Sequence, residues 1–173
     1  MTTPLTFHFK DDGAVPNHPR WPMLVYKAAL DLSASHDPEG DIESLFARNG
    51  WGHGQWRNGV YPFAHYHGRI HEVLGIARGS ASVRFGGDKG EVLALGPGDI
   101  AVLPAGTGHQ RLSDDKGLVV IGAYPPEGVY NLCRGDHPAD REAALKTIPL
   151  VPKPKSDPVA GRNGPLPALW TSA

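Results

Sequence analysis

The sequence of 173 residues has little cysteine, no excess of basic charge and no long apolar run. Cys133 is its only cysteine, which excludes an internal disulfide and a metal cage of several thiolates. The net charge of −1 gives no basic surface for a phosphate backbone. No apolar run reaches the length of a membrane span, and residues 1–7 lack the features of a secretion signal. We therefore expect a cytoplasmic protein with neither a nucleic acid nor a membrane as partner.

Glycine and proline are abundant instead, with 22 and 17 residues, whereas aromatic residues make up only 8%. This composition favours many short segments joined by turns, which is typical of a β-rich protein and not of a helix bundle. A chain of this length can form one domain whose core needs neither disulfides nor a structural metal. A metal, if bound, would therefore be available for function.

Short apolar or alternating segments, each closed by glycine, proline or aspartate, predict strands at 63–67, 71–77, 81–85, 91–95, 99–103 and 118–124. Their close spacing fits an antiparallel sandwich or barrel better than a fold with helices between parallel strands. We also expect a strand at 24–26, a helix at 41–50 with Asp41 as its N-cap, and a helix at 136–148. From Pro149 onward, six prolines predict an extended arm that is neither helix nor central strand.

The histidines gather in one part of the chain. His65 and His67 are separated by one residue, so in a strand both imidazoles leave the same face. With the carboxylate of Glu72 and the more distant His109, they form a set of ligands suited to one divalent metal ion. A single histidine is more often a surface or hydrogen-bonded core residue, so the prediction of a metal site depends on the set of four.

One alternative concerns which residue near position 70 faces the metal. If the strand from His65 continued without a break, His71 would share its face and Glu72 would not. The pair Gly68 and Arg69 offers a turn or bulge that resets this alternation. We prefer the reset, which makes Glu72 the ligand and leaves His71 facing outward or supporting the site.

Two motifs with fixed spacing contain these four residues. They are Gly59-x5-His65-x-His67-x4-Glu72-x6-Gly79 and Gly98-x5-Pro104-x-Gly106-x2-His109-x3-Ser113. The pair resembles the two motifs of the cupin superfamily and departs from them only at Ser113, where the family often has asparagine. At lower specificity, nearly the whole chain resembles an uncharacterised group of small bacterial single-domain cupins.

The resemblance implies a mainly β fold, the double-stranded β-helix or jelly-roll barrel, with a few short flanking helices. It also implies the metal ligands His65, His67, Glu72 and His109. Within one domain we expect a lead-in at 1–58, the barrel core at 59–125, and a C-terminal helix with a proline-rich arm at 126–173. The broad sheet faces of such barrels favour a homodimer.

Three imidazoles and one carboxylate are compatible with iron, manganese, nickel or zinc. The first functional hypothesis is a small metalloenzyme, an oxygenase or an isomerase or lyase, that acts on a small oxygen-rich metabolite. The alternative is a non-catalytic protein that binds or senses a small ligand through its metal. A positioned acid or base beside an open metal site would favour the enzyme.

Several side chains are candidates for the surroundings of the metal, although each also has a purely structural interpretation. The polar candidates for a catalytic or substrate-binding role are Tyr124, Trp56, Arg69, Gln55 and His53. Leu74, Val102 and Val120 are expected to form apolar walls, because they occupy alternating strand positions. Arg84 and Arg111 are expected to face solvent.

Overall fold

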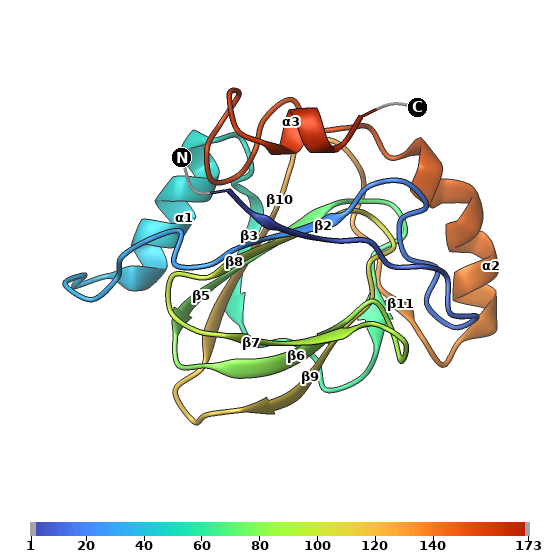
Figure 1. Cartoon of the computed structure of the whole chain (residues 1–173), viewed down its shortest axis with the longest axis horizontal. Helices are drawn as coiled ribbons and strands as arrows, with labels where there is room; N and C mark the ends of the chain where they lie inside the picture. Colours follow the sequence, from blue (N-terminus) through green and yellow to red (C-terminus); the bar gives the residue numbers. More distant parts are fainter. Residues whose placement is uncertain (1–2, 172–173) are drawn as a thin grey trace.

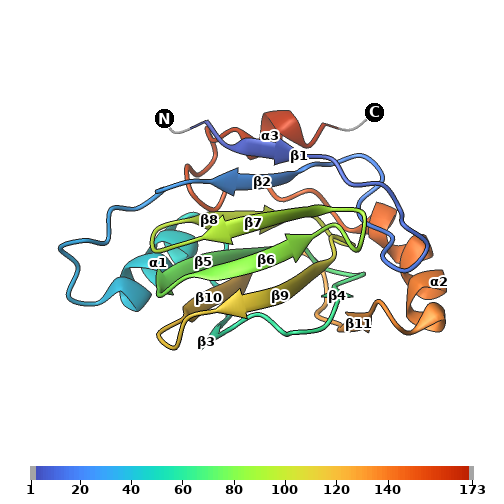
Figure 2. The same ribbon diagram turned by 60° about the horizontal axis from the view of Figure 1, so that its bottom comes forward.

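The fold is a barrel of two antiparallel sheets, seen in a computed structural model that describes residues 3–171. The six-stranded sheet has the order β1 (Leu5–Phe7), β2 (Met23–Tyr26), β8 (Ile100–Leu103), β5 (Glu72–Arg78), β10 (Val119–Tyr124) and β3 (His53–Asn58). The five-stranded sheet has the order β11 (Cys133–Arg134), β4 (His65–Tyr66), β9 (His109–Asp114), β6 (Ala81–Phe85) and β7 (Glu91–Leu95). The two sheets face each other in Figure 1, and Figure 2 shows β7, β6 and β9 of one sheet in front of β8, β5 and β10 of the other. The predicted mainly β, double-stranded β-helix fold is confirmed.

The four inner strands of the six-stranded sheet, β2, β8, β5 and β10, are buried on both faces. Alternate residues of β5 and β8 point in opposite directions, so Leu74 and its partner Ala101 face the barrel interior. Val73 and its partner Val102 face the opposite way, into a separate core that contains helix residues. The expectation that Val102 walls the metal site is therefore wrong, because this side chain lies on the outer face of its sheet.

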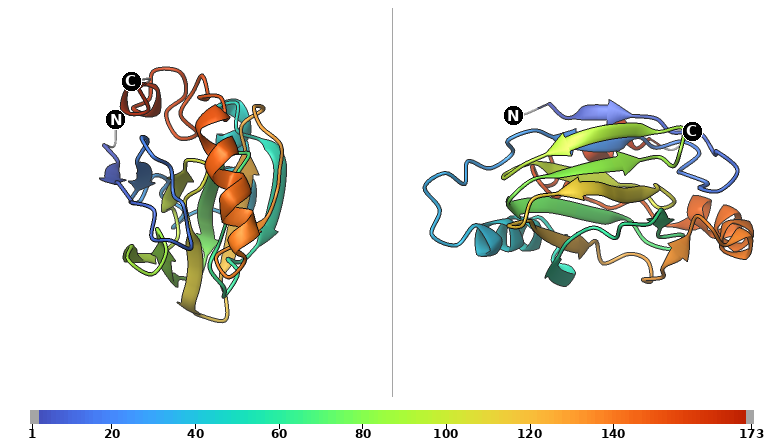
Figure 3. Two further views of the ribbon diagram at one scale, coloured as in Figure 1. Left: turned by 90° about the vertical axis from the view of Figure 1, so that its right-hand side faces the viewer. Right: turned by 90° about the horizontal axis from the view of Figure 1, so that it is seen from below.

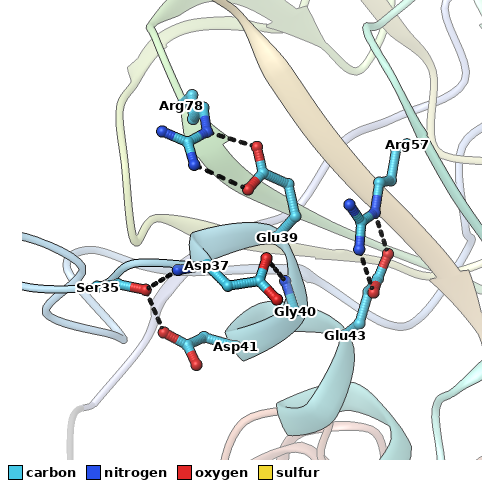
Figure 4. A network of polar contacts seen from close by, with 8 residues as sticks. All are labelled: Ser35, Asp37, Glu39, Gly40, Asp41, Glu43, Arg57 and Arg78. Atoms are coloured by element: carbon cyan, nitrogen blue, oxygen red, sulfur yellow. Dashed lines mark hydrogen bonds and ion pairs between the residues drawn. The ribbon is translucent and has the colours of Figure 1, made fainter.

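Helix α1 (Pro38–Arg48) covers that outer face (Figure 1). It approaches β5 closely at Gly75, where an added Cβ would lie 2.7 Å from Ile42. Two ion pairs, Arg57 with Glu43 and Arg78 with Glu39, connect the helix to β3 and to the end of β5 (Figure 4).

The start of α1 differs from the prediction. Asp37, and not Asp41, is the N-cap, since its side chain accepts a hydrogen bond from the Gly40 N–H at 3.0 Å (Figure 4). Pro38 at the first helical position needs no N–H partner, which extends the helix upstream of the predicted start. No helix in residues 3–171 is both long and apolar enough to cross a bilayer.

Helix α2 (Pro138–Thr147) and the one-turn helix η1 (Ile148–Leu150) lie across one end of the barrel (Figure 3). Ala144 of α2 packs so closely against Gly68 that a Cβ there would be 3.0 Å away. Thr147 Oγ1 donates a hydrogen bond to the Gly68 carbonyl at 2.7 Å. The helix thus supports the turn that follows His67.

Cys133 lies in the same hydrophobic cluster as Ala144 of α2. Burial raises the pKa of its thiol, which does not favour a role as a nucleophile.

The C-terminal arm runs back over the outer face of the six-stranded sheet (Figure 3). The prediction of a wholly extended arm is wrong, because α3 (Leu166–Leu169) is a short helix that begins directly after Pro165. Trp51 Nε1 donates to the Ser156 carbonyl, and Trp170 Nε1 donates to the Pro22 carbonyl. The arm is therefore bound to its own chain, and the predicted homodimer stays a prediction.

Asp157 anchors this arm, and we predict that its removal destabilises the fold. The buried carboxylate accepts hydrogen bonds from the Tyr26 hydroxyl and from the backbone N–H groups of Val159, Ala160 and Leu166. Asp157→Ala leaves these donors without an acceptor, so the free energy of unfolding should fall by about 3 kcal/mol. Urea denaturation measures the change. The exposed neighbour Lys155→Ala is the control, and equal stability of the two variants would contradict this anchoring role.

Candidate metal centre

Three potential metal ligands meet between the two sheets. His67 follows β4, Glu72 begins β5, and His109 begins β9. One ligand atom from each of the three lies within 4.8 Å of the others, and all three side chains are buried. The pairing of β4 with β9 places His65 directly opposite His109. The His65 ring packs against the His109 ring with centroids 3.9 Å apart, so all four predicted ligands border the same space.

The backbone fixes the orientation of the three imidazoles. The Nδ1 atoms of His65, His67 and His109 lie 3.0, 2.6 and 3.0 Å from the carbonyl oxygens of Phe63, Asn131 and Thr107. A carbonyl only accepts, so each Nδ1 must carry the hydrogen. Each neutral ring therefore keeps its Nε2 lone pair free, which is the arrangement that metal-binding histidines normally show.

Glu72 presents an oxygen to these lone pairs. Its Oε2 lies 3.2 Å from the Nε2 atoms of both His67 and His109. This oxygen is buried and has no hydrogen-bond partner among the described residues. Three acceptors without a donor repel one another unless a cation lies between them. The donor set therefore fits a metal ion.

The protonation states follow from the same contacts. Burial opposes the charge on Glu72, but the neighbouring His67 and His109 outweigh it and hold its pKa well below the usual value. Burial also opposes a charge on His67, but Glu72 and the Asn131 carbonyl raise its pKa above the usual value. Burial and the adjacent His109 lower the pKa of His65 to about 3. A proton that enters the site is therefore carried by the His67 imidazole and stabilised by the Glu72 carboxylate.

His71 faces away from this site. Its Nδ1 accepts a hydrogen bond from the Ala105 N–H at 2.9 Å, and its Nε2 donates to the Pro152 carbonyl at 3.1 Å. The ring lies among aromatic side chains, 5.6 Å from Trp21 and 5.0 Å from Trp170. Both ring nitrogens are occupied, and burial lowers the pKa of His71 to about 3. The chain bends at Gly68 and Arg69, so that Glu72 and not His71 points into the barrel.

A cavity of about 1040 Å³ leads to the four residues. His53, Trp56 and Tyr124, three of the polar candidates, line it, as does Leu74. The structure places the other two candidates elsewhere and corrects both expectations. Gln55 lies on the face of β3 opposite to Trp56, and its Nε2 donates to the Glu43 carbonyl of α1. Arg69 is exposed on the turn before β5.

Trp56 and Tyr124 form a fixed pair in this cavity. Trp56 Nε1 donates a hydrogen bond to the Tyr124 hydroxyl at 3.0 Å. Gly122 lies opposite Trp56 in the register of β3 and β10, and an added Cβ there would be 2.0 Å from the indole ring. The position therefore has to be glycine for the indole to lie over β10.

The sequence prediction missed three residues of this site. Tyr130 lines the cavity with its ring centroid 5.1 Å from that of His67, and the next residue, Asn131, holds the His67 ring. Their segment has no strand or helix periodicity that could have indicated them. Arg111 was expected to face solvent, but it lines the cavity and pairs there with Asp114, and its Nε donates to the Val60 carbonyl at 3.0 Å.

Comparisons with known proteins identify one full-length relative. The chain is 40% identical over 165 residues to the uncharacterized protein YjlB of Bacillus subtilis strain 168, covering 95% of each protein. No model of a known protein family matches the chain.

Among solved structures, the acireductone dioxygenase of Bacillus anthracis with a cadmium ion in its active centre is 21% identical. The match covers 63% of this chain and 82% of that protein, with a TM-score of 0.41. An uncharacterized conserved protein with a double-stranded beta-helix domain from Klebsiella pneumoniae is 14% identical; the match covers 78% and 81% of the two chains, with a TM-score of 0.37. From the identity to YjlB, the strand order and the two motifs, the chain belongs to the YjlB family within the cupin superfamily.

Proposed function

We propose that His65, His67, Glu72 and His109 bind one divalent metal ion, and that the protein is a metalloenzyme acting on a small oxygen-rich metabolite. One observation carries the proposal. The carbonyl acceptors of the three Nδ1 atoms leave the Nε2 lone pairs free, and the Nε2 atoms of His67 and His109 lie 3.2 Å from a buried Glu72 oxygen that lacks a donor among the described residues. Such a set of acceptors is stable only around a cation.

The donor set also limits the metal. Three imidazole nitrogens and one carboxylate oxygen are compatible with iron, manganese, nickel and zinc, and ligand chemistry does not select among them. Bound there, the ion would supply Lewis acidity toward a substrate oxygen, or redox chemistry if it is iron.

The chain itself contributes binding, orientation and exclusion of water. Leu74 and Val60 form apolar parts of the cavity wall, and Tyr124 holds a phenolic proton inside it. Burial and then the Glu72 carboxylate raise the pKa of Tyr124, so the phenol stays protonated at neutral pH. A proton donor beside an accessible metal site supports an oxygenase or an isomerase or lyase over a closed binding site.

The function is tested by metal analysis followed by an activity screen. Protein purified without added metal should contain about one divalent ion per chain. The protein is then loaded separately with Fe²⁺, Mn²⁺, Ni²⁺ and Zn²⁺ and incubated with small carboxylates, phenols and sugars. Turnover with one metal supports the enzyme. Binding without turnover across the screen would support the non-catalytic alternative instead.

We predict that Glu72→Gln weakens metal binding by more than about tenfold, because it keeps the shape of the ligand but removes its charge. His71→Ala should leave metal affinity within about threefold, since both nitrogens of His71 bond to the backbone elsewhere. It should instead lower the free energy of unfolding by about 2 kcal/mol. Competition with a coloured chelator measures affinity, and the reverse ranking would show that the ligand assignment is wrong.

We also predict that metal affinity falls as the pH drops. A proton on His67 competes with the metal, and the pKa of this side chain is raised above its usual value near 6.5. Affinity should therefore be full only above that raised pKa, and below it should fall by up to about tenfold per pH unit. Chelator competition between pH 8 and pH 5 measures the slope. The exposed His137→Ala variant should show the same slope, and a constant affinity across this range would exclude His67 as a ligand.

A further inference from the structure

The cavity wall beyond the four ligands has a distinct chemistry. Its aromatic members come from two parts of the chain and are Trp56, Tyr61, Tyr124 and Tyr130. Its two arginines are each matched by a carboxylate, Arg57 by Glu43 and Arg111 by Asp114. The arginine charges are therefore balanced, and the charge of the metal site itself dominates the inner end of the cavity.

We propose that the cavity takes a singly charged organic anion with an aromatic body, which presents two oxygen atoms to the metal and accepts a hydrogen bond from Tyr124. This inference rests on the proposed metal site and names the class of ligand that the site selects.

The charge of the ligand follows from the protonation states. Three neutral imidazoles and one carboxylate around a divalent ion leave a net charge of +1 in a buried place. A buried net charge is costly, and a ligand with one negative charge removes it. A neutral ligand leaves the charge in place, and a dianion reverses it.

The number of oxygens follows from the coordination. On an ion that takes six ligands, as iron, manganese and nickel often do, four protein ligands would leave two positions free. The cavity reaches the ligand side chains, so both positions are accessible from it. A ligand with a carboxylate and a nearby hydroxyl can fill both positions, and it loses less freedom than two separate ligands.

The hydrogen bond follows from the geometry of Tyr124. Its oxygen already accepts from Trp56 Nε1, so its own hydrogen points to another acceptor, for which a ligand oxygen competes with the nearby Glu72 carboxylate. The phenol has little room to turn away. Gly122 leaves just enough room for the indole that bonds to the phenol, and a Cβ added at Gly54 would lie 3.1 Å from the tyrosine ring. The hydroxyl is thus a fixed donor in the cavity, suited to an anionic oxygen.

The aromatic body follows from the mouth of the cavity. Tyr130 and Tyr61 keep 52% and 47% of their surface exposed there. The Tyr130 ring packs edge to face against the Tyr124 ring, with centroids 5.7 Å apart at an angle of 72°, and both phenols line the cavity. Aromatic ligands gain from both kinds of contact, whereas saturated rings of equal size gain only from burial. A cavity of about 1040 Å³ also exceeds the needs of a two-carbon acid.

The test uses protein loaded with one equivalent of Co²⁺, whose visible absorption reports on ligands that enter the metal shell. We would titrate it with salicylate, with cis-2-hydroxycyclohexanecarboxylate as the saturated match, and with benzoate, which keeps the carboxylate but lacks the hydroxyl. Salicylate should shift the spectrum and bind at least about fivefold more tightly than either analogue. Equal affinity for salicylate and its saturated match would overturn the aromatic body, and equal affinity for benzoate would overturn chelation by the carboxylate and hydroxyl together.

Variants locate the contacts. Tyr124→Phe should weaken salicylate by about three- to tenfold while leaving Co²⁺ affinity unchanged. Tyr130→Ala should weaken salicylate but not the saturated analogue, and the exposed neighbour Val129→Ala should weaken neither. If both tyrosine variants bind salicylate as the parent does, the proposed binding mode is wrong. Failure to retain Co²⁺ would refute the metal site itself, whereas retained Co²⁺ with no response to salicylate would refute only the ligand class.

Discussion

A buried carboxylate surrounded by imidazole lone pairs is the constraint on which the site depends. Glu72 is almost completely buried, and an ionised group in the interior is unfavourable unless it is compensated. The backbone carbonyls already bind the Nδ1 hydrogens of the neighbouring histidines, so neutral rings offer Glu72 no donor. Compensation must come from a cation. The raised pKa of His67 and the lowered pKa of Glu72 show that a proton on His67 can compensate the carboxylate. The proposed metal would provide the same compensation in the same place.

The start of β5 connects this site to the opposite side of the molecule. Glu72 points into the barrel, while His71, one residue earlier, bonds to the Pro152 carbonyl of the C-terminal arm. Helix α2 supports the preceding turn through Gly68, whose lack of a side chain lets Ala144 approach. The helix and the arm therefore both contact the short segment of backbone from Gly68 to His71, directly before Glu72.

Alternation along short strands allowed much of the site to be predicted. The spacing of His65 and His67 and the break at Gly68 placed Glu72 inside, and the turn at Gly98 has the positive φ of +84° that only glycine adopts easily. The same rule failed for Val102, because β8 is buried on both faces and carries no polar residue to mark the outer one. Strands β3 and β9 were missed because their mostly polar, partly exposed residues give no apolar pattern.

The residues that alternation cannot reveal are those that long-range contacts bring to the site. Asn131 belongs to a segment without regular structure, yet its carbonyl accepts from His67 Nδ1 and its side-chain oxygen accepts from the backbone N–H groups of Gly68 and Arg69. One residue thus orients an imidazole and holds the turn that resets the strand. Because Tyr130 is its neighbour, the cavity wall and the ligand geometry are fixed by the same short segment. A ligand that contacts Tyr130 should therefore alter the orientation of the His67 ring, because the Asn131 carbonyl next to Tyr130 is hydrogen-bonded to His67 Nδ1.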